Sequence, residues 1–268
     1  MRTGPIRKRF GQHFLEPAWV TKVIGAIAPR ADECFFEIGP GRGALTRPLA
    51  TRARSVVAFE IDRDLTAALR QSAPPNVTVI EGDFLESRWM LDHPPPTPVR
   101  VVGNLPYNVA SPILFRLVDL HAAGCPLVDA TVMLQREVAR RLAARPGSRT
   151  YGVLTALIGH SAEATELFSL PPGAFRPAPK VHSTLVRLRF HPPDPPVRDL
   201  ACFRALVESV FTRRRKTLAN ALLAFPGAKR LAPSAALAAA GLNGTRRPET
   251  LSITELASLS DIYAQAVL

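Results

Sequence analysis

The stretch Cys34-Phe35-Phe36-Glu37-Ile38-Gly39-Pro40-Gly41-Arg42-Gly43 decides the fold, because an apolar run of strand length passes directly into a glycine-rich turn. Glycines let the backbone pass close to a ligand, and a helix after such a turn presents free N–H groups. The other strand-like runs are 55–61, 77–80, 99–102 and 130–134, and the helical patterns are 19–28, 45–52, 65–72, 111–120 and 136–144. This alternation predicts an α/β fold with a parallel sheet covered on both faces.

The chain changes character at a proline-rich segment. Residues 181–190 mix apolar and polar side chains with a period of two, which predicts a late antiparallel strand. The following six residues, His191-Pro192-Pro193-Asp194-Pro195-Pro196, are typical of a linker. The helices expected beyond it are 200–211, 216–225, 233–240 and 253–267. We therefore expect two domains, an α/β domain over residues 1–191 and a small all-helical domain over residues 192–268.

The net charge of +12 and a pI near 10.7 indicate a polyanionic partner, nucleic acid first and an anionic membrane surface second. Residues 191–268 hold 10 Lys and Arg against 6 Asp and Glu, a net +4 that leaves +8 for residues 1–190. The charge is therefore not a tail, and any basic patch must be assembled by folding.

Cysteine usage and the N-terminus predict a reducing compartment. Cys34, Cys125 and Cys202 are far apart and odd in number, so they suggest neither a disulfide framework nor a CxxC metal pair. Residues 1–10 are basic but have no apolar signal-peptide region, and the sequence has no run of 18 apolar residues. We expect a cytoplasmic monomer without membrane contact and without a metal ion.

Acidic residues at the ends of three successive predicted strands indicate an adenosine-binding site. Glu60 ends the strand after the glycine turn, where a carboxylate can accept both hydroxyls of a ribose. Asp83 follows the next strand, where it can accept the adenine amino group; an Asx turn is the alternative. Glu37, two residues before Gly39, would repel a pyrophosphate but suits the cationic amino acid end of S-adenosylmethionine. The methyl donor is favoured over NAD or FAD, which stay open.

The segment Asn104-Leu105-Pro106-Tyr107 follows a strand and suits an exocyclic amine on a flat ring. The Asn104 side-chain oxygen can accept a hydrogen bond from the amine, and Pro106 stiffens the turn. Tyr107 offers a face on which a base can stack. An ordinary surface turn is the alternative.

Six motifs in this order resemble one family. They are residues 9–15 (RFGQHFL), 37–41 (EIGPG), 104–107 (NLPY), 175–183 (FRPAPKVHS), 214–222 (RRKTLANAL) and 247–249 (RPE). The combination, over residues 7 to about 260, is similar to the rRNA adenine N6-dimethyltransferases of the KsgA/Dim type. This resemblance implies a Rossmann-like class I methyltransferase sheet over residues 1–191, which binds S-adenosylmethionine, and a helical rRNA-binding domain over residues 192–268.

The resemblance also implies the substrate and the site. Two adjacent adenosines in a loop near the 3′ end of small-subunit rRNA would be dimethylated at N6, within a 30S-like assembly intermediate. The cofactor-binding residues that it implies are His13, Leu15, Gly39, Gly41, Glu60, Asp83 and Asn104. His13 stands where many relatives have Asn.

The expected chemistry is positioning. The Asn104 side chain and the Leu105 carbonyl would accept the two amine hydrogens and aim the nitrogen lone pair at the methyl group. Tyr107 and Phe175 would sandwich the extruded base, with core packing as the alternative for Phe175. Arg213, Arg214, Arg215 and Lys216, expected at a helix start, would contact phosphates unless they form only a solvated face.

Two other functions stay open. An Erm-type enzyme that acts on large-subunit rRNA shares most of the cofactor motifs. A non-catalytic RNA-binding ribosome assembly factor could keep the fold, although the intact Asn104 motif and the cofactor acids argue against it.

Overall fold

The computed structural model describes residues 13–95 and 97–266. The chain divides into two compact units: Met1–Ala139 with Glu163–Phe190, and Arg140–Ala162 with His191–Leu268. Residues 140–162, which we expected in the first domain, have their contacts in the second unit. The first four residues of the motif at 9–15 lie outside the described residues. The division of cofactor binding and RNA binding between two domains stays a prediction.

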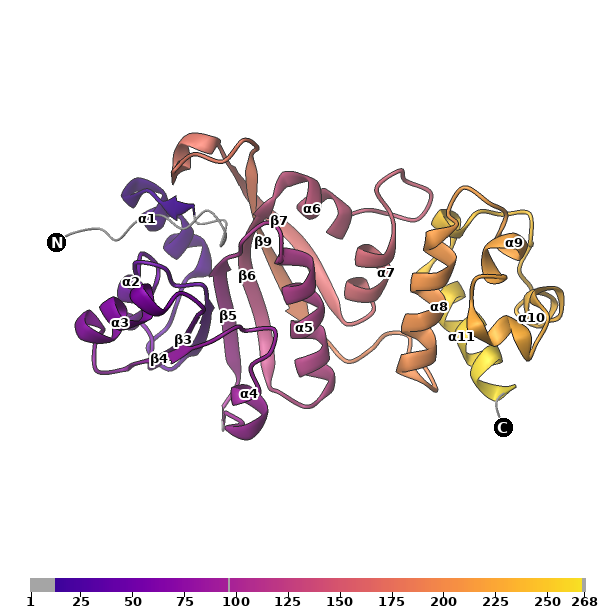
Figure 1. Cartoon of the computed structure of the whole chain (residues 1–268), viewed down its shortest axis with the longest axis horizontal. Helices are drawn as coiled ribbons and strands as arrows, with labels where there is room; N and C mark the ends of the chain where they lie inside the picture. The colour runs from indigo at the N-terminus through magenta and orange to yellow at the C-terminus, as the bar shows by residue number, and fades with distance from the viewer. Residues whose placement is uncertain (1–12, 96, 267–268) are drawn as a thin grey trace. The chain divides into compact units, whose positions relative to one another are not determined.

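The first unit is an α/β sheet (Figure 1). Within the described residues it has seven strands in the order β4-β3-β2-β5-β6-β9-β7. The strands are β2 (Cys34–Ile38), β3 (Ser55–Glu60), β4 (Val77–Glu81), β5 (Val99–Asn104), β6 (Leu127–Gln135), β7 (Ala162–Leu170) and β9 (Ser183–Phe190). Strands β2 to β6 pair in parallel, and β9 pairs antiparallel with β6, as predicted. The chain order reverses direction between β2 and β5, the kind of position where open α/β sheets bind ligands.

The helices of this unit follow the predicted alternation. They are α1 (Pro17–Ile27), α2 (Thr46–Ala50), α3 (Arg63–Ser72), α4 (Trp89–Asp92) and α5 (Ala110–Ala122), while α6 (Arg136–Leu142) begins in this unit and ends in the second. The start of α3 shows why the boundaries lie where they do, because the Asp62 side chain accepts hydrogen bonds from the N–H groups of Asp64 and Leu65. A small two-stranded sheet pairs β1 (Phe14–Leu15) with β8 (Phe175–Arg176).

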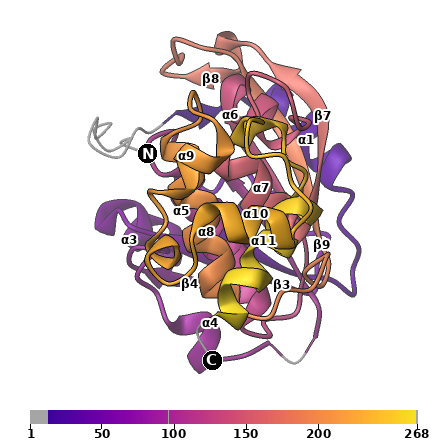
Figure 2. The same ribbon diagram turned by 90° about the vertical axis from the view of Figure 1, so that its right-hand side faces the viewer.

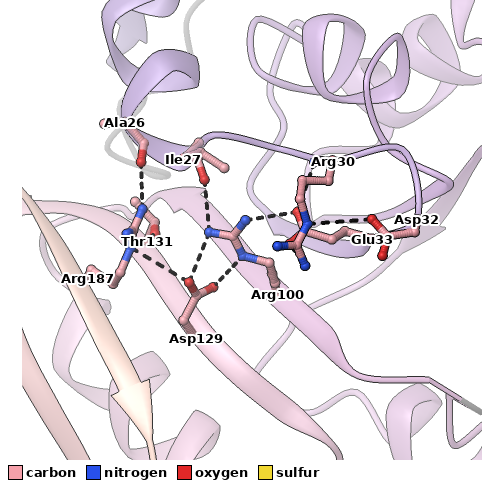
Figure 3. Close-up of polar contacts among 9 residues, drawn as sticks. All are labelled: Ala26, Ile27, Arg30, Asp32, Glu33, Arg100, Asp129, Thr131 and Arg187. Carbon is pink, nitrogen blue, oxygen red and sulfur yellow. Dashed lines mark hydrogen bonds and ion pairs between the residues drawn. The ribbon is translucent and has the colours of Figure 1, made fainter.

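A buried ion network ties the end of α1 to the sheet (Figure 3). Both contacts between the Arg100 guanidinium and the Asp129 carboxylate measure 3.0 Å, and Arg100 Nη1 lies 2.9 Å from Glu33 Oε2. Arg100 also donates to the carbonyl of Ile27, one of the oxygens that the end of a helix leaves without a partner. Arg187, Ala26 and Thr131 extend the network on one side, and the exposed Arg30 contacts Glu33 and Asp32 on the other (Figure 3).

The second unit is helical (Figure 2). Its helices are α7 (Val153–Gly159), α8 (Leu200–Thr212), α9 (Leu218–Leu222), α10 (Pro233–Ala239) and α11 (Ile253–Gln265). Helix α8 packs against α11, whose start carries a capping box formed by Ser252 and Glu255. No helix among the described residues is both long and apolar enough to cross a membrane.

Candidate active site

A cavity of about 300 Å³ lies at the carboxyl ends of the parallel strands. Its walls come from the turns after β2, β3, β4 and β5, together with the segment around β1. Of the site residues expected from the sequence, those lining it are His13, Leu15, Gly39, Gly41, Glu60, Asp83, Asn104, Leu105 and Tyr107. Adjacent parallel strands end at one edge of the sheet, so the fold brings these residues together from distant parts of the chain.

The glycine turn forms a narrow wall of the cavity. Gly39 and Gly41 have φ angles of 68° and 57°, a backbone conformation that favours glycine. A Cβ built on Gly41 would lie 3.0 Å from the ring of Phe14, so a side chain there would crowd the cavity. The N–H of Gly41 donates to Glu60 Oε2 at 2.9 Å, and the N–H of Asp62 donates to Glu60 Oε1 at 2.9 Å. The turn therefore holds the Glu60 carboxylate in place.

Glu37 is a buried carboxyl group on the same wall. It is 1% exposed, and burial raises its pKa to about 7; a hydrogen bond from the Thr46 side chain opposes this rise, and the nearby Glu60 carboxylate adds to it. Apart from Thr46, no described residue donates a hydrogen bond to Glu37 Oε2. An orphaned buried oxygen beside a cavity suits a cationic ligand group, so this carboxyl fits the ammonium end of S-adenosylmethionine.

Asp83 follows strand β4 and is the third acidic residue expected at the site. Its Oδ1 accepts a hydrogen bond from the N–H of Leu85 at 2.9 Å, which is the Asx turn considered as the alternative. The residue is half-buried and also lines the cavity. Asp83 therefore both forms the Asx turn and lines the cavity, and its contact with an adenine stays a prediction.

Asn104 and Tyr107 form a corner of the cavity, and His13 contacts both of them. Asn104 Nδ2 donates to the main-chain oxygen of His13 at 2.6 Å. The ring of His13 stacks on Tyr107, with centroids 5.6 Å apart and planes at 26°, and its Nδ1 lies 2.7 Å from the carbonyl oxygen of Pro177. This bond fixes the orientation of the Asn104 amide, and the residue lines the cavity. The Tyr107 hydroxyl lies 2.6 Å from Ser183 Oγ.

The prediction that Phe175 stacks on a base is wrong. Its side chain is 0% exposed and belongs to the core cluster with Leu15, Ile24 and Leu185. The neighbouring prolines suggested an exposed loop, but β8 pairs with β1 and turns this ring inward. The alternative, core packing, is the one that the structure has.

The basic cluster lies in the helical unit, in the turn after α8 rather than at a helix start. Helix α9 begins at Leu218, so the N–H groups of a helix N-terminus are not available to this cluster. Arg213, Arg215 and Lys216 are exposed. Arg214 is half-buried, lies 3.8 Å from the Glu249 carboxylate and donates to the carbonyl of Arg149 at 3.0 Å.

Sequence reasoning missed one residue of this corner, Ser183. It is the last residue of the motif at 175–183, and its contact with Tyr107 joins positions 76 residues apart. The period-two pattern of 181–190 marked it as a strand residue, but no local signal linked it to the cavity. In the described ranges, no group of three His, Cys, Asp or Glu could hold a metal ion.

Comparisons with known proteins agree with this geometry. Residues 4–265 match the family described as ribosomal RNA adenine dimethylase. Ribosomal RNA small subunit methyltransferase A of Alcanivorax borkumensis is 39% identical over 98% of this chain and 91% of its own length. The protein with the same description from Xanthomonas axonopodis pv. citri is 41% identical over 97% of each chain.

Two solved structures have the same fold over most of the chain. The 23S rRNA methyltransferase ErmE is 31% identical, with a TM-score of 0.65 over 94% of this chain and 100% of its own. A dimethyladenosine transferase from Plasmodium falciparum has a TM-score of 0.72 over 92% of this chain and 96% of its own, at 22% identity. The second is a likeness of fold alone.

Proposed function

The chain belongs to the ribosomal RNA adenine dimethylase family, and on that premise we propose that it dimethylates N6 of two adjacent adenosines in the 3′-terminal hairpin loop of small-subunit rRNA. The observation that supports the chemistry is Asn104, which lines the cavity and whose amide is held in one orientation by its bond to the His13 main-chain oxygen. Identity of 39–41% to small-subunit enzymes, against 31% to a large-subunit enzyme, supports the choice of rRNA.

The cavity is assigned to S-adenosylmethionine, the methyl donor of class I methyltransferases. When bound, this cofactor supplies a methyl group on a positively charged sulfur, from which it leaves readily. Glu37 would face the ammonium group, Glu60 the ribose and Asp83 the adenine amine. His13, Leu15, Gly39 and Gly41 would complete the walls around the methionine end.

The chain's own residues would do the catalytic work by holding the target amine. The Asn104 side-chain oxygen and the Leu105 main-chain oxygen accept its two hydrogens, which draws the nitrogen out of the ring plane and directs its lone pair. No strong base is needed, because the proton can leave to solvent after transfer. Tyr107 would stack on the extruded base, a contact worth about 1–3 kcal/mol.

Replacement of Glu37 by glutamine is expected to change stability and cofactor affinity in opposite directions. The folded pKa of about 7 lies above the unfolded value of 4.5, so Glu37 stabilises the fold below pH 4.5, and that contribution is lost as pH rises through 7. Glu37→Gln should stabilise the ligand-free protein at pH 8 by on the order of 3 kcal/mol. It should also weaken cofactor binding. In the unmodified protein, cofactor affinity should rise with pH near 7 as Glu37 becomes charged, and the variant should lack this rise.

Thermal unfolding at pH 5 and pH 8, with calorimetric titration of the cofactor, measures both effects. Glu86→Gln, which changes an exposed carboxylate in the loop after Asp83, is the control and should alter neither. A Glu37→Gln protein that binds cofactor like the unmodified chain would rule out the ammonium contact.

The exposed turn after α8 is assigned to RNA phosphates. Arg213, Arg215 and Lys216 are the exposed cations, whereas the contacts of Arg214 give it a role in the fold. Changing the three exposed residues to alanine should reduce the salt dependence of RNA binding, lowering the slope of log K against log salt by about 2–3. Filter binding to the rRNA hairpin at several salt concentrations measures it.

A matched triple variant separates this turn from general charge. The control variant changes Arg198, Lys229 and Arg230, which border a cavity of about 680 Å³ near the start of α8. Helix α8 is about 20 Å long, so this cavity lies well away from the turn that follows the helix. Their replacement should leave most of the salt slope in place. If the first triple variant keeps the full slope, the phosphate contact is excluded.

An Erm-type activity on large-subunit rRNA is the second candidate, since ErmE shares the fold and 31% of the sequence. Incubation of unmethylated small and large subunit rRNA with the protein and labelled cofactor separates the two. The proposal expects N6,N6-dimethyladenosine in the small-subunit RNA, read as a nucleoside mass and a primer-extension stop. We further propose that the protein acts as a monomer on a 30S-like assembly intermediate. The three free cysteines support a reducing compartment, and we propose the cytoplasm.

A further inference from the structure

Ser183 connects the sheet to the corner where the base is expected. It is the first residue of β9 and pairs with Gln135 of β6. Its side chain is 0% exposed, and it is not among the residues that line the cavity. Its Oγ lies 2.6 Å from the hydroxyl of Tyr107. A buried strand hydroxyl thus contacts the tip of the ring that faces the ligand space.

Tyr107 needs such an anchor because its backbone does not lie in a regular element. It stands in the turn between β5 and α5, and its side chain is half-buried. A tyrosine ring in a turn can rotate about two side-chain bonds unless its far end is held. The stacked ring of His13 contacts one face, and the bond to Ser183 restrains the hydroxyl end.

We propose that Ser183 is a positioning residue. It fixes the plane of the Tyr107 ring, so that the ring is already oriented for stacking when the target adenine enters. The inference rests on the proposed function, because it takes Tyr107 as the stacking residue. Ser183 acts only through Tyr107: it has no access to the base, and its hydroxyl is already engaged. The motif at 175–183 therefore orients two residues of the site without contacting the base. The Pro177 carbonyl oxygen contacts the His13 ring, and Ser183 contacts the Tyr107 hydroxyl.

The experiment is a double-mutant cycle with Ser183→Ala and Tyr107→Phe. Each removes the same hydrogen bond from one side and leaves the partner hydroxyl buried without it, so each should lower kcat/KM for rRNA about tenfold. The double variant should be no worse than either single variant, because both hydroxyls are then absent. The dissociation constant of S-adenosylmethionine should stay within twofold of that of the unmodified protein.

Two further variants make the outcomes decisive. The hydroxyl of Ser169 donates to the main-chain oxygen of Ser183 at 3.4 Å. Ser169→Ala removes this neighbouring hydrogen bond without changing the contact of Tyr107, so it should keep full activity. Tyr107→Ala tests the stacking role itself and should lose far more than tenfold. If Ser183→Ala does not fold, Tyr107→Phe still tests the inference, because it removes the same hydrogen bond at the half-buried residue Tyr107.

The results divide cleanly. Full activity of Ser183→Ala or of Tyr107→Phe overturns the inference, and so does a roughly hundredfold loss in the double variant, since Ser183 would then act independently of Tyr107. If Tyr107→Ala also keeps full activity, the stacking role in the proposed function fails as well. If Tyr107→Ala loses activity but Ser183→Ala does not, only the positioning role of Ser183 is excluded.

Discussion

Replacing Asn104 by alanine is expected to lower the rate of methyl transfer by on the order of 10³-fold, the loss typical of a preorganised hydrogen-bonding group at a reacting centre. The variant removes the side-chain oxygen that would accept an amine hydrogen. It also removes the hydrogen bond from Nδ2 to the His13 main-chain oxygen, so cofactor affinity should fall modestly, by less than about tenfold. Single-turnover methylation of small-subunit rRNA at saturating cofactor, beside calorimetric titration, measures the two effects separately.

Two companion variants separate the roles of the Asn104 amide. Asn104→Asp keeps an acceptor oxygen but places a carboxylate against the His13 carbonyl, so it should lose cofactor affinity more than Asn104→Ala does. Asn108→Ala changes an exposed amide that lines the same cavity and should keep most of the activity. Normal methylation by Asn104→Ala would show that the amine is held elsewhere.

Replacing Arg100 by methionine is expected to destabilise the first unit by about 3 kcal/mol, because it leaves buried carboxylates without their main partner. The side chains of Arg100, Asp129 and Glu33 are 12%, 10% and 14% exposed, so water screens the lost charge poorly. Methionine keeps much of the side-chain volume, which makes the effect one of charge rather than of a cavity. Arg187, whose Nε lies 3.7 Å from Asp129, limits the loss.

Thermal unfolding checks this, with a fall in Tm of about 10 °C expected for a unit of this size. Arg63→Ala is the matched control. It breaks the contact between Arg63 and Glu81 at 3.2 Å, but the arginine side chain is 86% exposed, so the change should stay below about 1 kcal/mol. Equal Tm shifts for the two variants would show that burial of the Arg100 network contributes nothing.

The sequence alone determined most of the order of elements and the edge of the sheet at which the cavity lies. Buried parallel strands are short continuous apolar runs, so β2 was predicted to the residue. Gly39, Glu60, Asp83 and Asn104 were found because each stands at the end of such a run. Their convergence follows from parallel pairing, with no knowledge of side-chain packing. Strand β7 was missed because most of its side chains are at least partly exposed and form no apolar pattern.

Only the tertiary structure decided which way particular side chains face. Phe175 enters the core because β8 pairs with β1, an element 160 residues earlier in the chain. Arg214 supports the helical unit because Glu249 and the Arg149 carbonyl meet it there, although its neighbours in sequence are exposed. The bond between Tyr107 and Ser183 and the burial that raises the pKa of Glu37 likewise depend on groups distant in sequence. A local pattern reports backbone preference and amphipathicity, whereas orientation and ionisation follow from what the folded chain places around each group.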